Sequence, residues 1–141
     1  MSLENNTLDI LICGFKPLFL DFARQLFDIE TQISQKDYKI IVIGESGGAV
    51  ATDLSCGYII CPQSMELDGR IKCGGIITCG MDIKCTLSFS SIDYDKALLS
   101  INRRIDFDDK SIHQCEKPVD YYEQLSVYEN LVLQGLNILT M

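Results

Sequence analysis

The residues best suited to chemistry follow a short apolar segment in the first half of the chain. Residues 39–43 are a lysine and four β-branched aliphatic residues, and the glycine-rich segment after them is Gly44, Glu45, Ser46, Gly47 and Gly48. This segment matches G-x-S-x-G, with which serine hydrolases place a nucleophile on a sharp turn between a strand and a helix. The backbone N–H groups of such a turn also bind anions. Residues 44–48 could therefore serve either serine hydrolysis or the binding of an anion.

Hydrolysis at Ser46 requires a general base, and the sole histidine of the chain is His113. Because His113 follows Ser46, the chymotrypsin order is excluded, whereas the α/β-hydrolase order of serine, acid and histidine is allowed. Only one strand precedes the turn, and no His-Gly-Gly segment supplies an oxyanion hole. We therefore predict that Ser46 caps the following helix, with a hydrolase using Ser46 and His113 as the alternative. The acids available to it are Asp93, Asp95, Asp106, Asp108 and Asp109.

Anion binding needs no side chain at all, since a glycine-rich turn at a helix start presents its own N–H groups. The spacing is not G-x-G-x-x-G, and the Glu45 carboxylate would repel a phosphate. We predict a ligand site formed by residues 44–48 together with Gly14, which closes the first apolar run. No cofactor is predicted. A nucleotide or phosphorylated metabolite is the alternative, and it would belong to a nucleotide-dependent transferase or ligase.

Seven cysteines are present, and most lie inside apolar runs. Cys73, Cys79 and Cys85 have five residues between one and the next (C-x5-C-x5-C), a wider spacing than the knuckles that bind zinc. We expect reduced, mostly buried thiols and no metal site. The acidic run 106–109 lacks the spacing of a calcium loop.

The 141 residues carry a net charge of −8 and are 47% hydrophobic, which suits a single globular domain spanning residues 1–141. A negative charge of that size disfavours nucleic acid and anionic membranes as partners. No apolar stretch is long enough to span a membrane, and no secretory signal is recognisable. With cysteines placed as core residues, these features indicate a cytoplasmic protein.

In the first half, apolar residues 8–13 predict a strand, and residues 17–29 show helical spacing behind Pro17. The strand at 39–43 completes a βαβ unit, which implies parallel pairing. A short helix at 47–54 and a strand at 57–61 extend this half, which covers residues 8–61.

In the second half, strands are predicted at 75–79, 84–90 and 97–105, joined by short turns as an antiparallel meander over residues 75–105. An acidic loop at 106–109 follows, and then a helix at 120–139. That helix is apolar in more directions than one core face requires, because Val127, Leu133 and Ile138 remain outside the main stripe. We therefore predict a possible homodimer through the C-terminal helix.

Residues 58–105 resemble the end of the central domain of the Mur ligases, the ATP-dependent amide ligases of cell-wall synthesis. Residues 58–64 (YIICPQS) stand where that family has a strand ending in an Asn-Ala-Asp-Asp-Pro motif, and residues 76–80 (IITCG) stand where a strand ends in Thr-Tyr-Gly. The carboxylates of the first motif are replaced here by Pro62-Gln63-Ser64, and no G-x-x-x-x-G-K-[ST] loop is present. The resemblance implies the fold and a lost or altered nucleotide site.

Together these features predict an α/β fold, with a short parallel, Rossmann-like sheet core, an antiparallel extension and a C-terminal helix. The predicted function is that of a non-catalytic cytoplasmic module, which binds a small molecule or a protein partner at the turn of residues 44–48. An enzyme using the same turn is the alternative.

Overall fold

The computed structural model describes residues 9–45, 53–63 and 71–140. The chain divides into two compact units, Met1–Ile76 and Ile77–Met141. The division falls within strand β4 (Ile71–Cys79), close to residue 75, where the sequence pattern changes. Parallel strands and α-helices are both present, so the predicted α/β class is confirmed. That both units form one domain stays a prediction.

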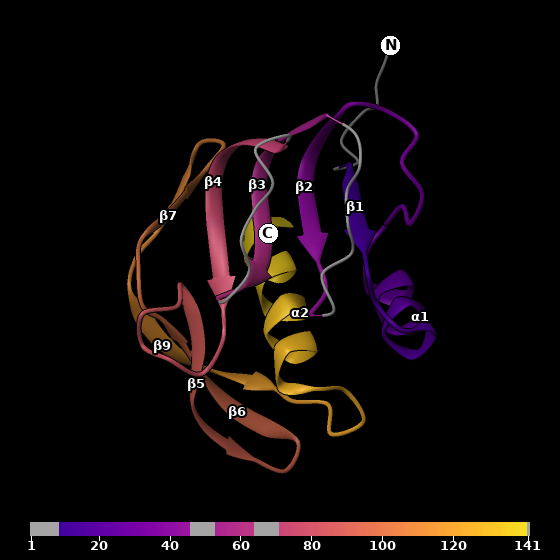
Figure 1. Ribbon diagram of the computed structural model, residues 1–141. Coiled ribbons are helices and arrows are strands. Elements are labelled where there is room, and N and C mark those ends of the chain that lie inside the picture. The colour runs from indigo at the N-terminus through magenta and orange to yellow at the C-terminus, as the bar shows by residue number, and fades with distance from the viewer. Residues whose placement is uncertain (1–8, 46–52, 64–70, 141) are drawn as a thin grey trace. The chain divides into compact units, whose positions relative to one another are not determined.

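The first unit contains a parallel sheet. Its elements are β1 (Ile10–Cys13), α1 (Pro17–Leu26), β2 (Asp37–Ile43), β3 (Leu54–Pro62) and the first part of β4, with the strands hydrogen-bonded in that order. β1 pairs in parallel with β2, and β2 pairs in parallel with β3. The predicted βαβ arrangement is therefore confirmed (Figure 1).

Burial explains why the apolar runs of this unit became strands. Ile10, Leu11 and Ile12 of β1 are each at most 2% exposed, and Ile40 and Ile41 of β2 are fully buried. A strand covered on both faces has no polar side to alternate with, which is the pattern expected of parallel sheets. The outer edge of β1 is covered as well, because the backbone of Glu30 pairs with it through hydrogen bonds to Ile10 and Ile12.

Two local boundaries in the first unit differ from the predictions. Helix α1 ends at Leu26 rather than at residue 29, because Phe27 is extended and leads the chain to the pairing of Glu30 with β1. Leu54 opens strand β3 instead of closing a helix, and its pairing partners lie on β2. The remainder of the helix predicted at 47–54 lies outside the described residues, apart from Asp53.

The second unit is mainly antiparallel. It contains the end of β4, β5 (Leu87–Asp93), β6 (Lys96–Ile101), β7 (Ile105–Phe107), β8 (Lys110–Ile112), β9 (Cys115–Asp120) and α2 (Val127–Thr140). β6 pairs antiparallel with both β5 and β9, and β7 with β8 forms a separate hairpin. The antiparallel extension and the C-terminal helix are thus confirmed. No helix among the described residues is long and apolar enough to cross a membrane.

The predicted meander over residues 75–105 is wrong at its first step, because Cys79 pairs with Leu87 in parallel. Residues 80–86 form a loop that brings the chain back alongside the end of β4. Two threonines hold its ends: the backbone N–H of Thr78 donates to Thr86 Oγ1 at 3.1 Å, and that of Thr86 donates to Thr78 Oγ1 at 3.0 Å. A loop closed in this way replaces the tight turn that antiparallel pairing requires.

The strand predicted at 97–105 is divided in two at Asn102. The Asn102 amide donates to the Cys85 carbonyl at 3.0 Å and to Ser88 Oγ at 2.9 Å, so the residue is tied to neighbouring segments. The chain then enters the β7–β8 hairpin, in which the acidic run 106–109 provides part of β7 and the turn. Asp108 has a φ of 54° at that turn, a conformation that aspartate tolerates better than most residues.

Helix α2 begins at Val127, seven residues later than predicted. Asp120 is the last residue of β9 instead, and residues 121–126 connect that strand to the helix. A capping box starts the helix: Glu129 N–H donates to Ser126 Oγ, and Ser126 N–H donates to the Glu129 carboxylate. This signal is legible in the sequence as Ser-x-x-Glu at 126–129. Helical spacing alone did not locate the boundary.

Candidate functional site

The carboxyl ends of β1 and β2 meet through two glycines. Gly14 follows β1 with a φ of 82°, and Gly44 follows β2 with its N–H donating to the Cys13 carbonyl at 2.8 Å. A Cβ on Gly44 would lie 2.8 Å from the carbonyl carbon of Gly14 and would overlap its oxygen. The two backbones therefore approach as closely as residues without side chains permit.

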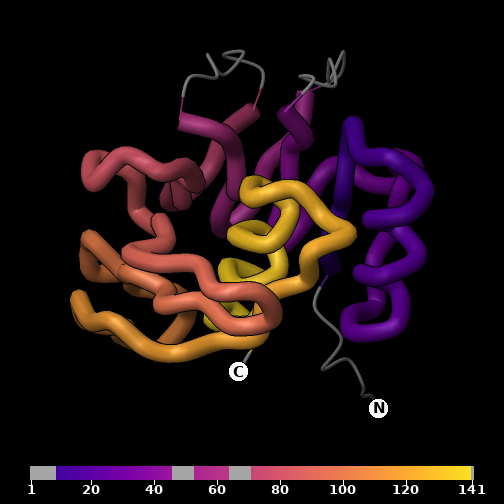
Figure 2. The backbone as a smooth tube through the Cα atoms, turned by 90° about the horizontal axis from the view of Figure 1, so that it is seen from below, coloured from indigo at the N-terminus to yellow at the C-terminus, as the bar shows by residue number. Residues whose placement is uncertain are grey.

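Helix α1 starts three residues after Gly14. Lys16 is its N-cap residue, Pro17 is its first residue, and no acidic residue lies in its first turn. No side chain among the described residues caps the helix. Phe15 stacks on the fully buried Phe19 with ring centroids 4.4 Å apart, which fixes the entry of the chain into the helix. Figure 2 shows α1 beside the sheet strands of its own unit, following the end of β1.

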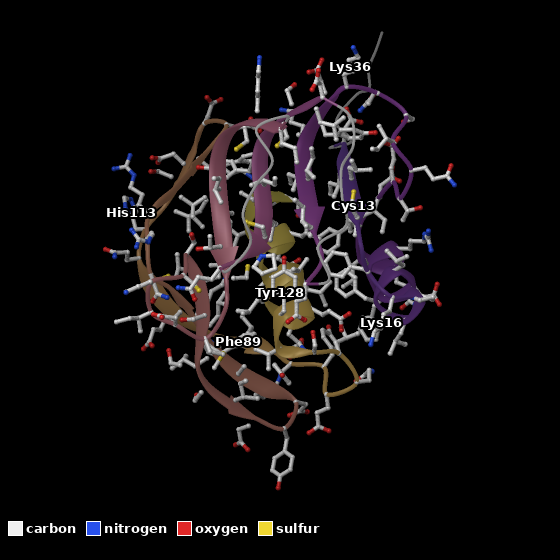
Figure 3. The ribbon with its side chains drawn as sticks, in the orientation of Figure 1. Cys13, Lys16, Lys36, Phe89, His113 and Tyr128 are labelled. Carbon is white, nitrogen blue, oxygen red and sulfur yellow. The ribbon has the colours of Figure 1, made fainter. Side chains whose placement is uncertain are left out.

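Lys16 is exposed at this helix start, whereas Lys36 lies at the opposite end of the same unit, just before β2 (Figure 3). The positive end of the helix dipole and the Lys16 ammonium thus act in the same sense. The lysine was not among the residues predicted from sequence. Its position immediately before a proline at a helix start was the available signal.

The predicted ligand residues are only partly described. Gly14 and Gly44 are brought together, and Glu45 is exposed next to them. Ser46, Gly47 and Gly48 lie outside the described residues, so the form of the turn stays a prediction. The predicted end of the strand is confirmed, because β2 ends at Ile43, directly before the motif.

The residues of the alternative hydrolase lie in the second unit, apart from Ser46. His113 is exposed between β8 and β9, and its candidate acids are exposed as well. Hydrogen bonds from Ser111 at 2.5 Å and Arg104 at 2.9 Å lower the pKa of the Asp106 carboxyl, and the charge of His113 contributes in the same direction. Asp106 therefore forms an ion pair with Arg104 on the exposed β7–β8 hairpin.

We expect a fluorophosphonate probe to leave Ser46 unlabelled. A serine reacts with such probes when a neighbouring base activates its hydroxyl, and the exposed environment of His113 shows no arrangement that would do so. The measurement is intact-protein mass spectrometry after incubation, with a known serine hydrolase as the positive control. A stoichiometric adduct on the native protein that disappears in Ser46→Ala would contradict the expectation.

All seven cysteines lie within the described residues, and none of them forms a disulfide bond. Cys56, Cys61, Cys79 and Cys85 are buried, Cys13 and Cys73 are half-buried, and Cys115 is exposed. Burial raises the pKa of Cys56 to about 12 and that of Cys61 to about 11, so both are protonated at neutral pH. Among the described residues no three metal-ligating side chains converge. The predicted absence of a metal stays a prediction.

A shallow depression of about 320 Å³ lies in the second unit and was not predicted. It is lined by Asp95, Asp120, Tyr121, Tyr122, Glu123 and Gln124. Lys96 neutralises part of its charge through an ion pair with Asp120 at 2.6 Å. Burial and the charge of Glu123 raise the pKa of Tyr121, whose ring packs edge-on against Phe89. The depression is thus acidic and aromatic, but shallow and formed largely by exposed side chains.

No protein-family model matches this chain, and no significant match was found among curated proteins or solved structures. The resemblance of residues 58–105 to the Mur ligases therefore stays a prediction from short motifs.

Proposed function

We propose that this protein is a non-catalytic module that binds a small anionic ligand, such as a phosphorylated metabolite, at the carboxyl ends of β1 and β2. The observation that supports the proposal is the close backbone approach of Gly14 and Gly44 beside the start of α1. Ligands of open α/β sheets bind outside the carboxyl ends of the strands, where loops and helix N-termini gather. Glycine at both positions keeps side chains away from that edge.

The charges at this edge attract an anion near the start of α1 and repel it near the end of β2. Lys16 and the uncapped start of α1 are attractive, whereas the Glu45 carboxylate is repulsive. A ligand with one anionic group and a neutral remainder fits this combination better than a polyanion. The anionic group would lie at Lys16, and the neutral part toward Gly44.

A Rossmann-like relationship belongs to the same proposal. The β1–α1–β2 crossover and the glycine after β1 are features of such folds. The strand order differs, since β1 is at the edge of its sheet here and lies inside the sheet in doubly wound folds.

Charge reversal at Lys16 should weaken the binding of an anionic ligand at least about tenfold, because a charge-assisted hydrogen bond contributes about 1.5–3 kcal/mol. The screen measures the thermal stability of the native protein with nucleotides, sugar phosphates and inorganic phosphate. A ligand that binds only the folded state raises the melting temperature. The affinity of each hit is then compared between wild type and Lys16→Glu.

Lys36→Glu is the matched control, because it makes the same charge change at the other end of the same unit (Figure 3). It should leave the affinity within a factor of about two, since charges farther apart than the Debye length of about 8 Å are largely screened. Equal weakening by both variants would indicate attraction to net charge rather than a site. A screen in which no anion raises the melting temperature would contradict the proposed function.

We propose a cytoplasmic location, which the seven thiols without disulfides favour. A protein partner or a homodimer through α2 also stays a proposal. Of the three residues that suggested the dimer, Leu133 and Ile138 are each 1% exposed and Val127 is half-buried. Val127 is thus the one of the three that stays accessible to a partner in the described residues, and the dimer stays a proposal.

A further inference from the structure

The four cysteines of the first unit gather around one hydrophobic cluster. Cys56 and Cys61 are among its buried members, and Cys13 and Cys73 pack against it as half-buried residues. The cluster also contains Leu54 of β3 and Ile71 of β4, so it includes residues of both strands. Cysteines are common core residues. Here four cysteines from three different strands surround one cluster, so some of their sulfur atoms can lie close to one another.

Two contacts between β3 and β4 fix which of these cysteines are opposite each other. Gly74 approaches the Gly57 carbonyl so closely that an added Cβ would lie 3.0 Å from the oxygen, and Gly75 lies under the ring of Tyr58. These contacts match Gly57 with Gly74 and Tyr58 with Gly75, so the two strands run in the same direction. The residue before each of the first two is a cysteine, and we infer that Cys56 lies beside Cys73.

The electrostatics of the buried thiols agree with that placement. After burial, the second cause that raises the pKa of both Cys56 and Cys61 is the charge of Cys73. The charge of Cys73 acts on both thiols, so Cys73 lies near each of them, and the contacts between β3 and β4 select Cys56 as its partner.

We propose that Cys56 and Cys73 form a reversible disulfide between β3 and β4 when the protein meets hydrogen peroxide. Neighbouring strands lie about 4.8 Å apart, within the range of roughly 4.4–6.8 Å between Cα atoms that a disulfide spans. Side chains directly opposite each other on adjacent strands bring Cβ atoms together at a strained distance, and strained disulfides are the more easily reduced ones. The bond is therefore a modification that thiols can undo rather than a permanent crosslink.

The order of the chemical steps follows from exposure. The half-buried Cys73 sulfur, as its thiolate, attacks one peroxide oxygen; the O–O bond breaks, giving a sulfenic acid and a hydroxide that takes up the thiol proton as water. The Cys56 sulfur then attacks the Cys73 sulfur, and its proton leaves with the sulfenic hydroxyl as a second water. One peroxide is reduced and two thiols are oxidised. Cys56 does not react first, because it is buried and protonated.

The test is oxidation of the full chain followed by mapping of the linked peptides. Cys115→Ser serves as the background, because the exposed Cys115 would otherwise link two molecules. After peroxide treatment, free thiols are blocked with iodoacetamide in denaturant, and the protein is digested with trypsin and chymotrypsin. Cleavage after Tyr58 separates Cys56 from Cys61. We expect one linked pair of peptides, containing Cys56 and Cys73, that disappears on treatment with dithiothreitol.

Matched variants distinguish the pair from its neighbours. Cys61→Ser and Cys79→Ser should retain the link, whereas Cys56→Ser and Cys73→Ser should abolish it. Wild-type mapping keeps the proposal testable if a buried substitution prevents folding. A link from Cys73 to Cys61 would overturn the proposal. So would oxidation of Cys73 to sulfinic acid without any link to β3.

Discussion

Gly44→Ala should unfold the protein or destabilise it by at least about 3 kcal/mol. The added methyl would overlap the carbonyl oxygen of Gly14 and lie 3.4 Å from that of Cys13. Both obstacles are backbone atoms held by the parallel pairing of β1 with β2, so they cannot rotate away as a side chain would. Overpacking against adaptable neighbours costs about 1–3 kcal/mol, and this site has none. Urea denaturation followed by circular dichroism measures the effect.

Gly14→Ala is the graded comparison for this prediction. Gly14 needs its positive φ of 82°, and a left-handed conformation costs an alanine about 1–2 kcal/mol. We therefore expect Gly44→Ala to lower the free energy of unfolding more than Gly14→Ala does. Similar losses at both positions would mean that conformation, rather than the close backbone approach, dominates at this edge.

Asn130→Ala should destabilise the protein by about 3 kcal/mol, through loss of the connection between β9 and α2. The Asn130 side chain is 1% exposed; its Oδ1 accepts from Tyr122 N–H at 2.8 Å, and its Nδ2 donates to the carbonyls of Tyr122 and Ser126, each at 2.9 Å. Its removal breaks these three hydrogen bonds at a half-buried turn, and each such bond contributes about 0.5–1.5 kcal/mol to stability. Thermal and urea denaturation measure the change.

Asn137→Ala is the matched control, because Asn137 is exposed on the same helix. Alanine has the better helix propensity, so this variant should be neutral or slightly stabilising, within about 0.7 kcal/mol. Equal destabilisation by the two substitutions would contradict the role assigned to the buried amide. An unchanged stability of Asn130→Ala would contradict it as well.

The first unit was predictable because β1 and the second half of β2 are buried on both faces. β1 and residues 40–43 of β2 are uninterrupted apolar runs, and only a strand or a buried helix has that pattern at such lengths. Pro17 marked the start of α1, and the spacing of strand, helix and strand then implied parallel pairing. The meeting of Gly14 with Gly44 follows from the same inference, since parallel strands end at the same edge.

The second unit was less predictable because its boundaries depend on side-chain hydrogen bonds between distant residues. Thr78 and Thr86 determine that the loop after β4 is not a hairpin, and Asn102 determines where β6 stops. Neither role is visible in hydrophobic periodicity. The β9 strand has a half-exposed alternating pattern and contains Pro118, which argues against a central strand and is tolerated at the edge of a sheet.

The pairing registers also order the events of folding in time. In β5 and β6, Asp93 pairs with Lys96, so that hairpin closes almost without loop entropy. In β1 and β2, Ile10 must find Ile40 across the whole of α1 before any pairing energy is gained. Local contacts form faster than distant ones. We therefore expect the β5–β6 hairpin to form early in folding, and the edge that carries Gly14 and Gly44 to form later.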